Sequence, residues 1–395
     1  MSTAYDEINI SQIPALEVLE RIGYIIIPPE QAEKMRGNLY NVILKEVLYE
    51  RLNEINGFEY RGQLYKFSEK NIQQALLDID EALTDGLIKT NEKIFDSLVY
   101  GRSYPENLSE MDGTKSFNLN YIDWEHPENN VYHVVEEFSV EREGGQGMIR
   151  PDIVTFINGI PFGVIECKKA SISIAQGISQ MLRNQGKEYS PQLFKFVQVV
   201  MSTNKNETQY ATTGTPKKFW SVWKEDLESD EYKWFKDTLE KTVVARIPTI
   251  QDQNIISIFH PKGIIDIIRF FSIYDKNVKK IARYQQYFAI KEIIKTIEEL
   301  DKNFNRQSGV IWHTQGSGKS LTMVMLARVI LSELADSHPQ VLVITDRVEL
   351  DSQIHQTFNH SRLRAEKATS GRNLVELINS NGADIITSLV HKFDT

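Results

Sequence analysis

The segment HTQGSGKS, residues 313–320, constrains the fold of this chain more than any other feature. An apolar run, GVIWH at 309–313, precedes it and LTMVMLARVILSEL follows at 321–334, so the sequence predicts a strand, a loop and a helix in that order. Gly316 and Gly318 allow backbone N–H groups to turn inward around a phosphate at the start of the helix. His313 stands where such loops usually begin with glycine, but the two later glycines still provide the turn.

The side chains of this loop suit a nucleotide and its magnesium ion. Lys319 offers a positive charge to the β- and γ-phosphates, and the hydroxyl of Ser320 can ligate Mg²⁺. We therefore expect Mg²⁺ and ATP as cofactors. The expected ATP-binding residues of the loop are Thr314, Gln315, Gly316, Ser317, Gly318, Lys319 and Ser320.

The residues after the loop predict a parallel sheet. VLVIT at 341–345 and ADIITS at 383–388 have the composition of buried strands, and a helix from about 347 separates them. Strands that alternate with helices favour an α/β fold. Upstream, IIDIIRFFSIYD at 264–275 and YQQYFAIKEIIKTIEEL at 284–300 are both expected to be helices.

Composition excludes several classes of protein. The 395 residues suggest two or three domains, and the single cysteine excludes a disulfide framework or a cysteine-based zinc site. The chain lacks a long apolar run and an apparent secretory signal, so we expect no membrane association. The single cysteine favours a reducing compartment, so we expect a cytoplasmic location. The net charge is −9, yet residues 160–220 hold eight basic against three acidic side chains. This local excess hints at a surface that faces phosphates.

A second candidate site lies in the β-rich segment 131–203. Asp152 precedes the expected strand 153–157. Glu166 and Cys167 end the β-rich run PFGVIEC at 161–167, and Lys168 follows directly. If the strand continues to Lys168, Glu166 and Lys168 are two residues apart and share a face. Carboxylates that converge on a hard cation are the ligands that Mg²⁺ requires. Asp152 reaches the same face only if the loop between the two strands has an odd number of residues, or if one strand carries an extra residue. We expect a three-residue loop, Ile157-Asn158-Gly159, or a bulge.

Other residues near this site admit several interpretations. An amphipathic helix over 171–189 would place Gln185 and Tyr189 on one face. Cys167 should point into the core, and His133 should be a strand residue without metal. Glu17 or Glu20, on the first expected helix, could contribute a further acid. Tryptophans in the 217–234 segment more often form a core than a base-stacking patch. By spacing alone, two acids and a lysine remain a common pattern.

The motifs together resemble two known families. RYQQ at 283–286, TQGSGKS, VLVITDRVELDSQ and IITSLVHKF resemble motifs Q, I, Ia and Ib of superfamily 2 helicases and translocases. The segment DRVELDSQ resembles the corresponding motif in the restriction (R) subunit of type I restriction–modification enzymes. By that resemblance Gln286, or its neighbour Gln285, contacts adenine, while Arg347 and Thr387 lie along the DNA track. The acidic DExx box of the family is absent from the 395 residues.

The upstream motif is similar to the PD-(D/E)xK nuclease core, including its QxxxY helix. The resemblance implies that Asp152 and Glu166 bind Mg²⁺ and that Lys168 orients or stabilises the reacting groups. It also implies that Gln185 and Tyr189 support the site or touch DNA. We expect an α/β chain with an endonuclease domain over 1–255, its core at about 131–205. The first part of a RecA-like motor should occupy 256–395, after a linker near 245–262.

The resemblance implies an ATP-dependent endonuclease subunit that translocates double-stranded DNA and works with methylase and specificity subunits. Without a DExx box, the 395-residue chain is expected to hydrolyse little ATP. A DNA-remodelling translocase whose nuclease-like domain is only structural is the alternative. An unrelated phosphate-loop NTPase is disfavoured by the Q and Ia motifs.

Overall fold

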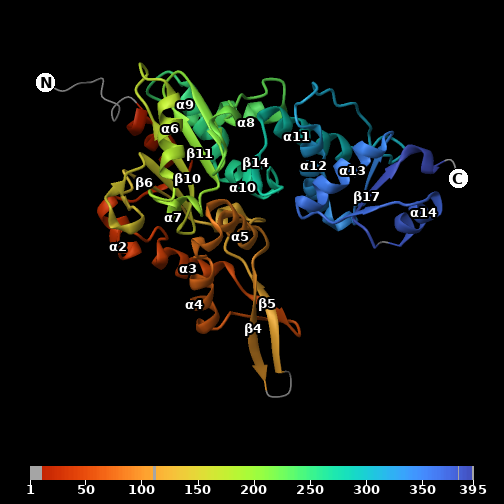
Figure 1. Cartoon of the computed structure of the whole chain (residues 1–395), viewed down its shortest axis with the longest axis horizontal. Coiled ribbons are helices and arrows are strands. Elements are labelled where there is room, and N and C mark those ends of the chain that lie inside the picture. Colours follow the sequence, from red (N-terminus) through yellow and green to blue (C-terminus); the bar gives the residue numbers. More distant parts are fainter. Residues whose placement is uncertain (1–10, 110–112, 381, 394–395) are drawn as a thin grey trace. The chain divides into compact units, whose positions relative to one another are not determined.

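The computed structural model describes residues 11–109, 113–380 and 382–393. Two compact units divide the chain, a first unit of residues 1–269 and a second unit of residues 270–395. Both are mixed α/β (Figure 1). Among the described residues, no helix combines the length and the apolar character needed to cross a bilayer.

A six-stranded mixed sheet forms the centre of the first unit, with strand order β1-β6-β9-β10-β11-β12. Neighbouring strands pair antiparallel except β1 with β6 and β10 with β11, which are parallel. Every residue of β9, β10 and β11 is buried, as expected of strands covered on both faces. The strands are β1 (Ile25–Ile26), β6 (Tyr132–Glu136), β9 (Ile153–Ile157), β10 (Ile160–Cys167), β11 (Val199–Thr203) and β12 (Thr208–Ala211).

Helices cover the two faces of β10. α6 (Ile174–Asn184) lies against the face that carries Glu166, because a Cβ on its Gly177 would come within 3.2 Å of Glu166 Cγ. On the opposite face, α9 (Ile250–Phe259) contributes Gln251, which donates to Cys167 Sγ at 3.8 Å. α1 (Ile13–Arg21) packs on α9 through its buried apolar residues. The sheet therefore lies between two helical layers.

The connection between β9 and β10 decides where Asp152 lies. It is a two-residue turn, since Asn158 and Gly159 have φ of 53° and 81°, the signature of a type I′ hairpin. The three-residue loop is therefore wrong. The alternative, a bulge, is confirmed, because the register shifts between Pro161 and Gly163. Ile153 of β9 pairs with Ile165 of β10. The next position along the two strands places Asp152 opposite Glu166.

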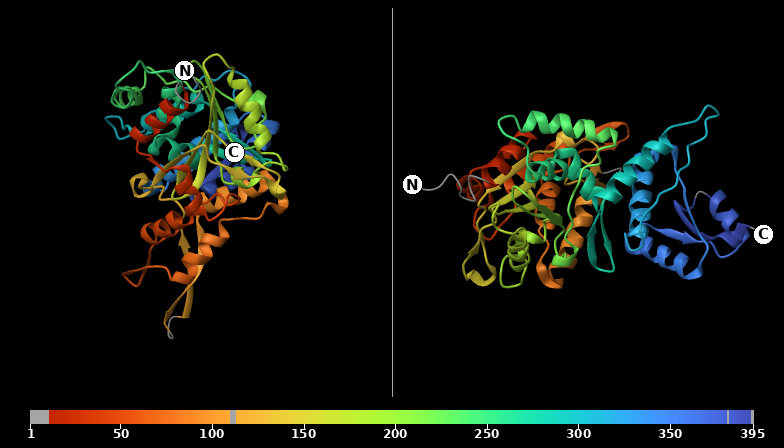
Figure 2. Two further views of the ribbon diagram at one scale, coloured as in Figure 1. Left: turned by 90° about the vertical axis from the view of Figure 1, so that its left-hand side faces the viewer. Right: turned by 90° about the horizontal axis from the view of Figure 1, so that it is seen from above.

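A helical layer and a long hairpin lie between β1 and β6 in the sequence. The layer contains α2 (Pro29–Arg36), α3 (Lys45–Ile55), α4 (Glu69–Asp78) and α5 (Leu87–Tyr100). The hairpin of β4 (Arg102–Ser109) and β5 (Gly113–Leu119) extends away from the sheet (Figures 1 and 2). A shorter hairpin joins β2 (Phe58–Tyr60) to β3 (Gln63–Tyr65). The sequence before residue 131 predicts mixed helix and loop, and it does not indicate these strands.

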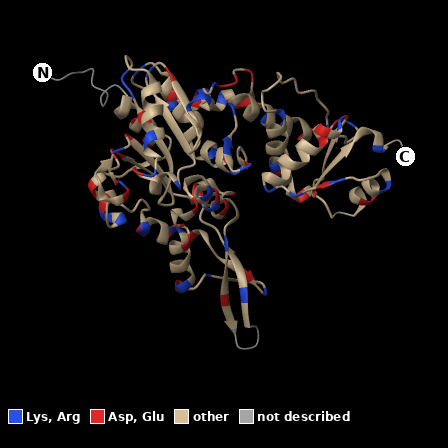
Figure 3. Ribbon diagram, viewed as in Figure 1, with Lys and Arg blue, Asp and Glu red and all other residues tan. Residues whose placement is uncertain are grey.

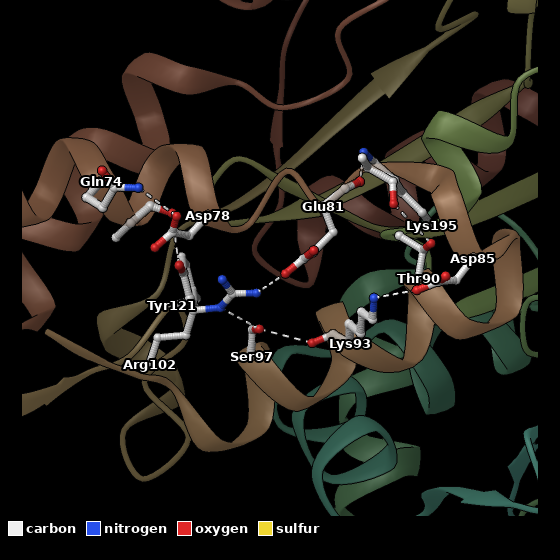
Figure 4. A network of polar contacts seen from close by, with 12 residues as sticks. Gln74, Asp78, Glu81, Asp85, Thr90, Lys93, Ser97, Arg102, Tyr121 and Lys195 are labelled. Atoms are coloured by element: carbon white, nitrogen blue, oxygen red, sulfur yellow. Dashed lines mark hydrogen bonds and ion pairs between the residues drawn. The ribbon is translucent and has the colours of Figure 1, made fainter.

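A polar network anchors the base of the long hairpin to the helices (Figure 4). Arg102 pairs with Glu81 and donates to Ser97 Oγ at 2.8 Å. Lys195, which follows α7 (Pro191–Phe194), donates to the main-chain oxygen of Glu81 at 2.6 Å and pairs with Asp80 at 2.7 Å. The helical layer is thus fixed to the sheet by buried and half-buried charges.

The segment 204–269 is more ordered than its polar composition indicates. It contains β12, α8 (Asp230–Thr242), α9 and α10 (Pro261–Arg269). The expected linker at 245–262 is mostly helix within the first unit, because Ile255, Ile256 and Phe259 are buried. The structure accordingly divides after Arg269, whereas the sequence suggested a boundary at 255.

The second unit contains a small parallel sheet of order β15-β17-β16. A hairpin of β13 (Ser272–Asp275) and β14 (Val278–Ile281) occupies part of the segment 264–275 that was expected to be helix. The remaining elements are α11 (Tyr284–Glu298), α12 (Lys319–Glu333), β15 (Val341–Thr345), α13 (Val348–His360), β16 (Ala365–Lys367), α14 (Gly371–Asn379) and β17 (Ile385–Leu389).

The expected strand before the phosphate loop does not form. Within the described residues, 309–313 pair with no strand, and Val310 and Trp312 are 93% and 90% exposed. An apolar run becomes a strand only when a neighbour satisfies its backbone. The sheet of this unit provides no such neighbour for 309–313.

Candidate functional site

Three charged side chains converge at the carboxyl end of β10. The ammonium of Lys168 lies 2.9 Å from Glu166 Oε1 and 3.7 Å from Asp152 Oδ2. Glu166 is fully buried and Lys168 is 7% exposed. The structure therefore brings together the Asp152, Glu166 and Lys168 that were singled out from the sequence.

Main-chain hydrogen bonds fix the positions of these side chains. Asp152 Oδ2 accepts from the backbone N–H of Cys167 at 2.7 Å, and Lys168 Nζ also donates to the Cys167 carbonyl at 3.0 Å. The backbone of Lys168 donates to Thr203 O at 2.8 Å, which ties the site to β11. Gln12, just before α1, donates to the main-chain oxygen of Asp152 at 3.3 Å. No sequence signal marks Gln12, because 140 residues separate it from its partner.

The electrostatics of Glu166 favour a bound cation. Burial, together with the nearby Asp152 carboxylate, raises the pKa of Glu166 to about 8, although Lys168 opposes the shift. Glu166 Oε2 is buried and has no hydrogen-bond partner among the described residues. A buried carboxylate oxygen without a donor is costly unless a cation or water meets it.

The donor set fits magnesium. No group of three or more His, Cys, Asp or Glu that could hold a metal occurs in the described part of the chain. Two carboxylates are nevertheless what Mg²⁺ commonly takes from protein, with waters and substrate phosphate completing its shell. Asp152 and Glu166 would therefore hold Mg²⁺, with Glu166 Oε2 directed to it.

Gln185 and Tyr189 do not lie on one helical face. α6 ends at Asn184, Gln185 caps it, and Tyr189 follows in a turn, so the expected helix over 171–189 is too long. Gln185 Oε1 accepts from the backbone of Gly214 at 2.8 Å. The ring of Tyr189 instead contacts arginines. The helix approaches the site through Gly177, which sequence reasoning missed.

The other candidates near the site have structural surroundings. Cys167 is buried on the opposite face, as expected. His133 lies in β6, and burial lowers its pKa to about 4. Glu17 and Glu20 are exposed on α1. Trp220 and Trp223 are buried, which agrees with a core role for them.

The phosphate loop of the second unit has the expected backbone. Gly316 and Gly318 have φ of 78° and 89°, and α12 begins at Lys319. Thr314 and Gln315 are exposed, as is Lys319, while Ser320 is half-buried. Ser317 Oγ is buried without a partner in the described structure. Such a loop at a helix N-terminus can hold a phosphate, so these residues fit a nucleotide and its Mg²⁺.

A cavity of about 420 Å³ adjoins this loop. Gln285 and Gln286 line it together with Trp312 and residues 313–317. The amide of Gln286 is engaged by protein, because its Nε2 donates to Thr322 Oγ1 at 3.1 Å and its Oε1 accepts from Arg283 N at 2.9 Å. Gln285 is exposed to the cavity.

Arg347 and Thr387 differ in accessibility. The side chain of Arg347 is 77% exposed beside Asp346 at the start of α13. Thr387 lies in β17 and is 1% exposed, with its Oγ1 lacking a partner in the described structure. In this arrangement, only Arg347 is presented to a ligand at the surface.

Fold and sites define a mixed α/β protein with a carboxylate–lysine cluster suited to a divalent cation and, in a separate unit, a phosphate-binding loop. Residues 4–219 match the family described as Type I restriction enzyme R protein N terminus, and residues 285–395 match the SWI2/SNF2 ATPase family. The chain belongs to the R protein family of type I restriction enzymes.

Curated relatives agree with this assignment. The putative type I restriction enzyme MjaIXP endonuclease subunit of Methanocaldococcus jannaschii is 32% identical over 300 residues, which cover 72% of this chain and 28% of the relative. The type I restriction enzyme HindI endonuclease subunit of Haemophilus influenzae is 26% identical over 384 residues, covering 90% of this chain and 33% of the relative. The chain thus spans about a third or less of the length of these relatives.

Proposed function

We propose that the first unit is a Mg²⁺-dependent DNA endonuclease with a PD-(D/E)xK core. The second unit would be the first part of a RecA-like, ATP-driven motor. Together they would act in an R subunit that translocates double-stranded DNA and cleaves it. The observation that carries the proposal is the convergence of Asp152, Glu166 and Lys168, with a buried oxygen of Glu166 left without a donor.

The chemistry of the nuclease site follows from this geometry. Bound between Asp152 and Glu166, Mg²⁺ would supply a Lewis acid for the scissile phosphate and for the attacking water. Lys168 keeps its ammonium beside both carboxylates, where it can neutralise negative charge that develops on the phosphate. The Cys167 backbone holds Asp152 in place, so the carboxylate is oriented before substrate arrives.

In the motor unit, residues 314–320 would hold the phosphates of ATP, with Lys319 as the side-chain cation and Ser320 on Mg²⁺. Gln285 is the better placed of the two glutamines to contact adenine, because the amide of Gln286 already bonds to Thr322 and Arg283. Arg347 would contact the DNA track. In the assembled enzyme, methylase and specificity subunits would select the sequence.

The alternative is an ATP-driven remodelling protein whose nuclease-like unit is only structural. A buried Glu166 and Lys168 argue against it, since an apolar core of the same shape would avoid their desolvation cost. The assembled enzyme with the full-length R subunit tests both ideas, on a plasmid that carries its recognition site. We expect Asp152→Ala to abolish linearisation while ATPase activity persists. Normal cleavage by Asp152→Ala would favour the structural alternative.

A further inference from the structure

The guanidinium groups of two arginines lie over the ring of Tyr189. The guanidinium carbon of Arg142 lies 4.6 Å from the ring centroid and that of Arg183 lies 5.6 Å from it. The backbone oxygen of Tyr189 accepts from Glu143 N at 2.8 Å, so the turn that contains Tyr189 is fixed to the segment that carries Arg142. Two positive charges therefore contact the same aromatic ring.

Both arginines lie on segments next to the carboxylate–lysine cluster, one close to it in sequence and one on a helix that packs against it. Arg142 opens the turn between β7 (Val140–Glu141) and β8 (Met148–Ile149), and Asp152 follows three residues after β8. Arg183 lies on α6, six residues after the Gly177 that packs on Glu166. At the rise of an α-helix, this spacing is about 9 Å, a few base pairs along a DNA duplex.

Neither arginine forms an ion pair with a carboxylate among the described residues. Arg142 Nε is buried and has no hydrogen-bond partner there. Arg142 has an acidic residue on each side in sequence, Glu141 and Glu143. Glu143 accepts from Tyr40 OH at 2.7 Å, and neither carboxylate pairs with Arg142. The two guanidinium groups at the Tyr189 ring therefore have no carboxylate partner among the described residues.

We propose that Arg142 and Arg183, held on Tyr189, bind a backbone phosphate of the DNA near the scissile bond. The guanidinium fork matches phosphate oxygens in geometry and charge. Tyr189 acts as a positioning residue, because it orders both arginines and does not itself contact the phosphate. This inference rests on the proposed nuclease function, since it takes DNA as the substrate.

Fluorescence anisotropy of a labelled duplex of about 30 base pairs, titrated with the 395-residue chain over a salt series, tests the proposal. Arg142→Ala and Arg183→Ala should each weaken DNA binding about tenfold. In the double variant, the slope of the log of the binding constant against log salt should fall by about one, the value for one lost phosphate contact. Arg61→Ala is the matched control, because Arg61 also lies over a tyrosine ring, at 5.3 Å from Tyr60. It should bind as the wild type does.

Conservative variants keep the test independent of folding. Arg142→Lys with Arg183→Lys should retain most of the salt slope and lose affinity, and Tyr189→Phe should bind normally while Tyr189→Leu binds weakly. Unchanged affinity and slope in the Ala double variant would overturn the phosphate site alone, provided that Asp152→Ala still abolishes cleavage in the assembled enzyme. Cleavage by Asp152→Ala would overturn both proposals. No DNA binding by the wild-type chain would overturn the phosphate site alone.

Discussion

The side-chain carboxylate of Asp152 is held by the backbone N–H of Cys167, at 2.7 Å, and not by the Cys167 side chain. The thiol points to the opposite face of β10, where it meets Gln251. Because only the backbone of Cys167 contacts Asp152, a substitution of the Cys167 side chain serves as a control within the candidate site.

Cys167→Ala should therefore leave cleavage by the assembled enzyme nearly unchanged. The backbone donor remains, and the lost thiol costs only packing, about 1 kcal/mol in the free energy of unfolding. Plasmid linearisation and thermal unfolding measure the two effects. Loss of cleavage with normal stability would show that the thiol itself takes part.

Gly177→Ala should damage the nuclease site, although alanine ordinarily stabilises a helix. A Cβ there would lie 2.3 Å from Ser202 Oγ and 3.2 Å from Glu166 Cγ. We expect a loss of about 1–3 kcal/mol in the free energy of unfolding, together with reduced cleavage. Gly309→Ala, where a Cβ meets nothing within 4 Å, is the control. A Gly177→Ala chain as stable as the wild type would contradict the packing of α6 on β10.

Protonated Glu166 should stabilise the cation-free chain, and this contribution should fall as pH rises from 4.5 to about 8. The pKa of Glu166 is raised from 4.5 to about 8 in the folded state, so the folded chain binds this proton more tightly than the unfolded chain does. The resulting stabilisation is full below the unfolded pKa and disappears as pH passes the folded pKa. Denaturant unfolding in EDTA across this range should show the wild type losing stability relative to Glu166→Gln as pH rises. Identical pH profiles would exclude a buried, protonated Glu166.

Lys319→Ala should abolish ATP hydrolysis and translocation by the assembled enzyme without unfolding it. Lys319 is the cation at the start of α12 that the loop offers to the phosphates. A coupled ATPase assay and a triplex-displacement assay give the two readouts, with circular dichroism for the fold. Wild-type ATPase activity in this variant would remove the motor assignment of the second unit.

Local patterns predicted much of the candidate site. The period of two at the end of β10 places Glu166 on one face with Lys168, which follows the strand, and Cys167 on the other. Glycines at 316 and 318 give the loop before α12 its positive φ angles. These features depend on residues close in sequence. They are therefore visible without the tertiary structure.

Long-range pairing determined the rest. The bulge beside Phe162 brings Asp152 to Glu166, and it depends on how β9 and β10 pair as well as on local sequence. Residues 309–313 have a strand-like composition but no neighbour within the described sheet. α6 ends five residues before Tyr189, where Gly186 and the turn that follows stop the periodicity. Gln12 enters the site from a distant segment, which no spacing in the sequence could indicate.

Cation binding by the 395-residue chain tests the central claim, a Mg²⁺ site between Asp152 and Glu166, most directly. Titration calorimetry with Mg²⁺, or electron paramagnetic resonance with Mn²⁺, should detect a site in the wild type that Glu166→Gln and Asp152→Asn both lose. Glu128→Gln, an exposed carboxylate of the first unit, should bind as the wild type does. At pH 7 binding should release a proton, because the raised pKa keeps Glu166 protonated before the cation arrives. Equal cation affinity in the wild type and Glu166→Gln would contradict the account.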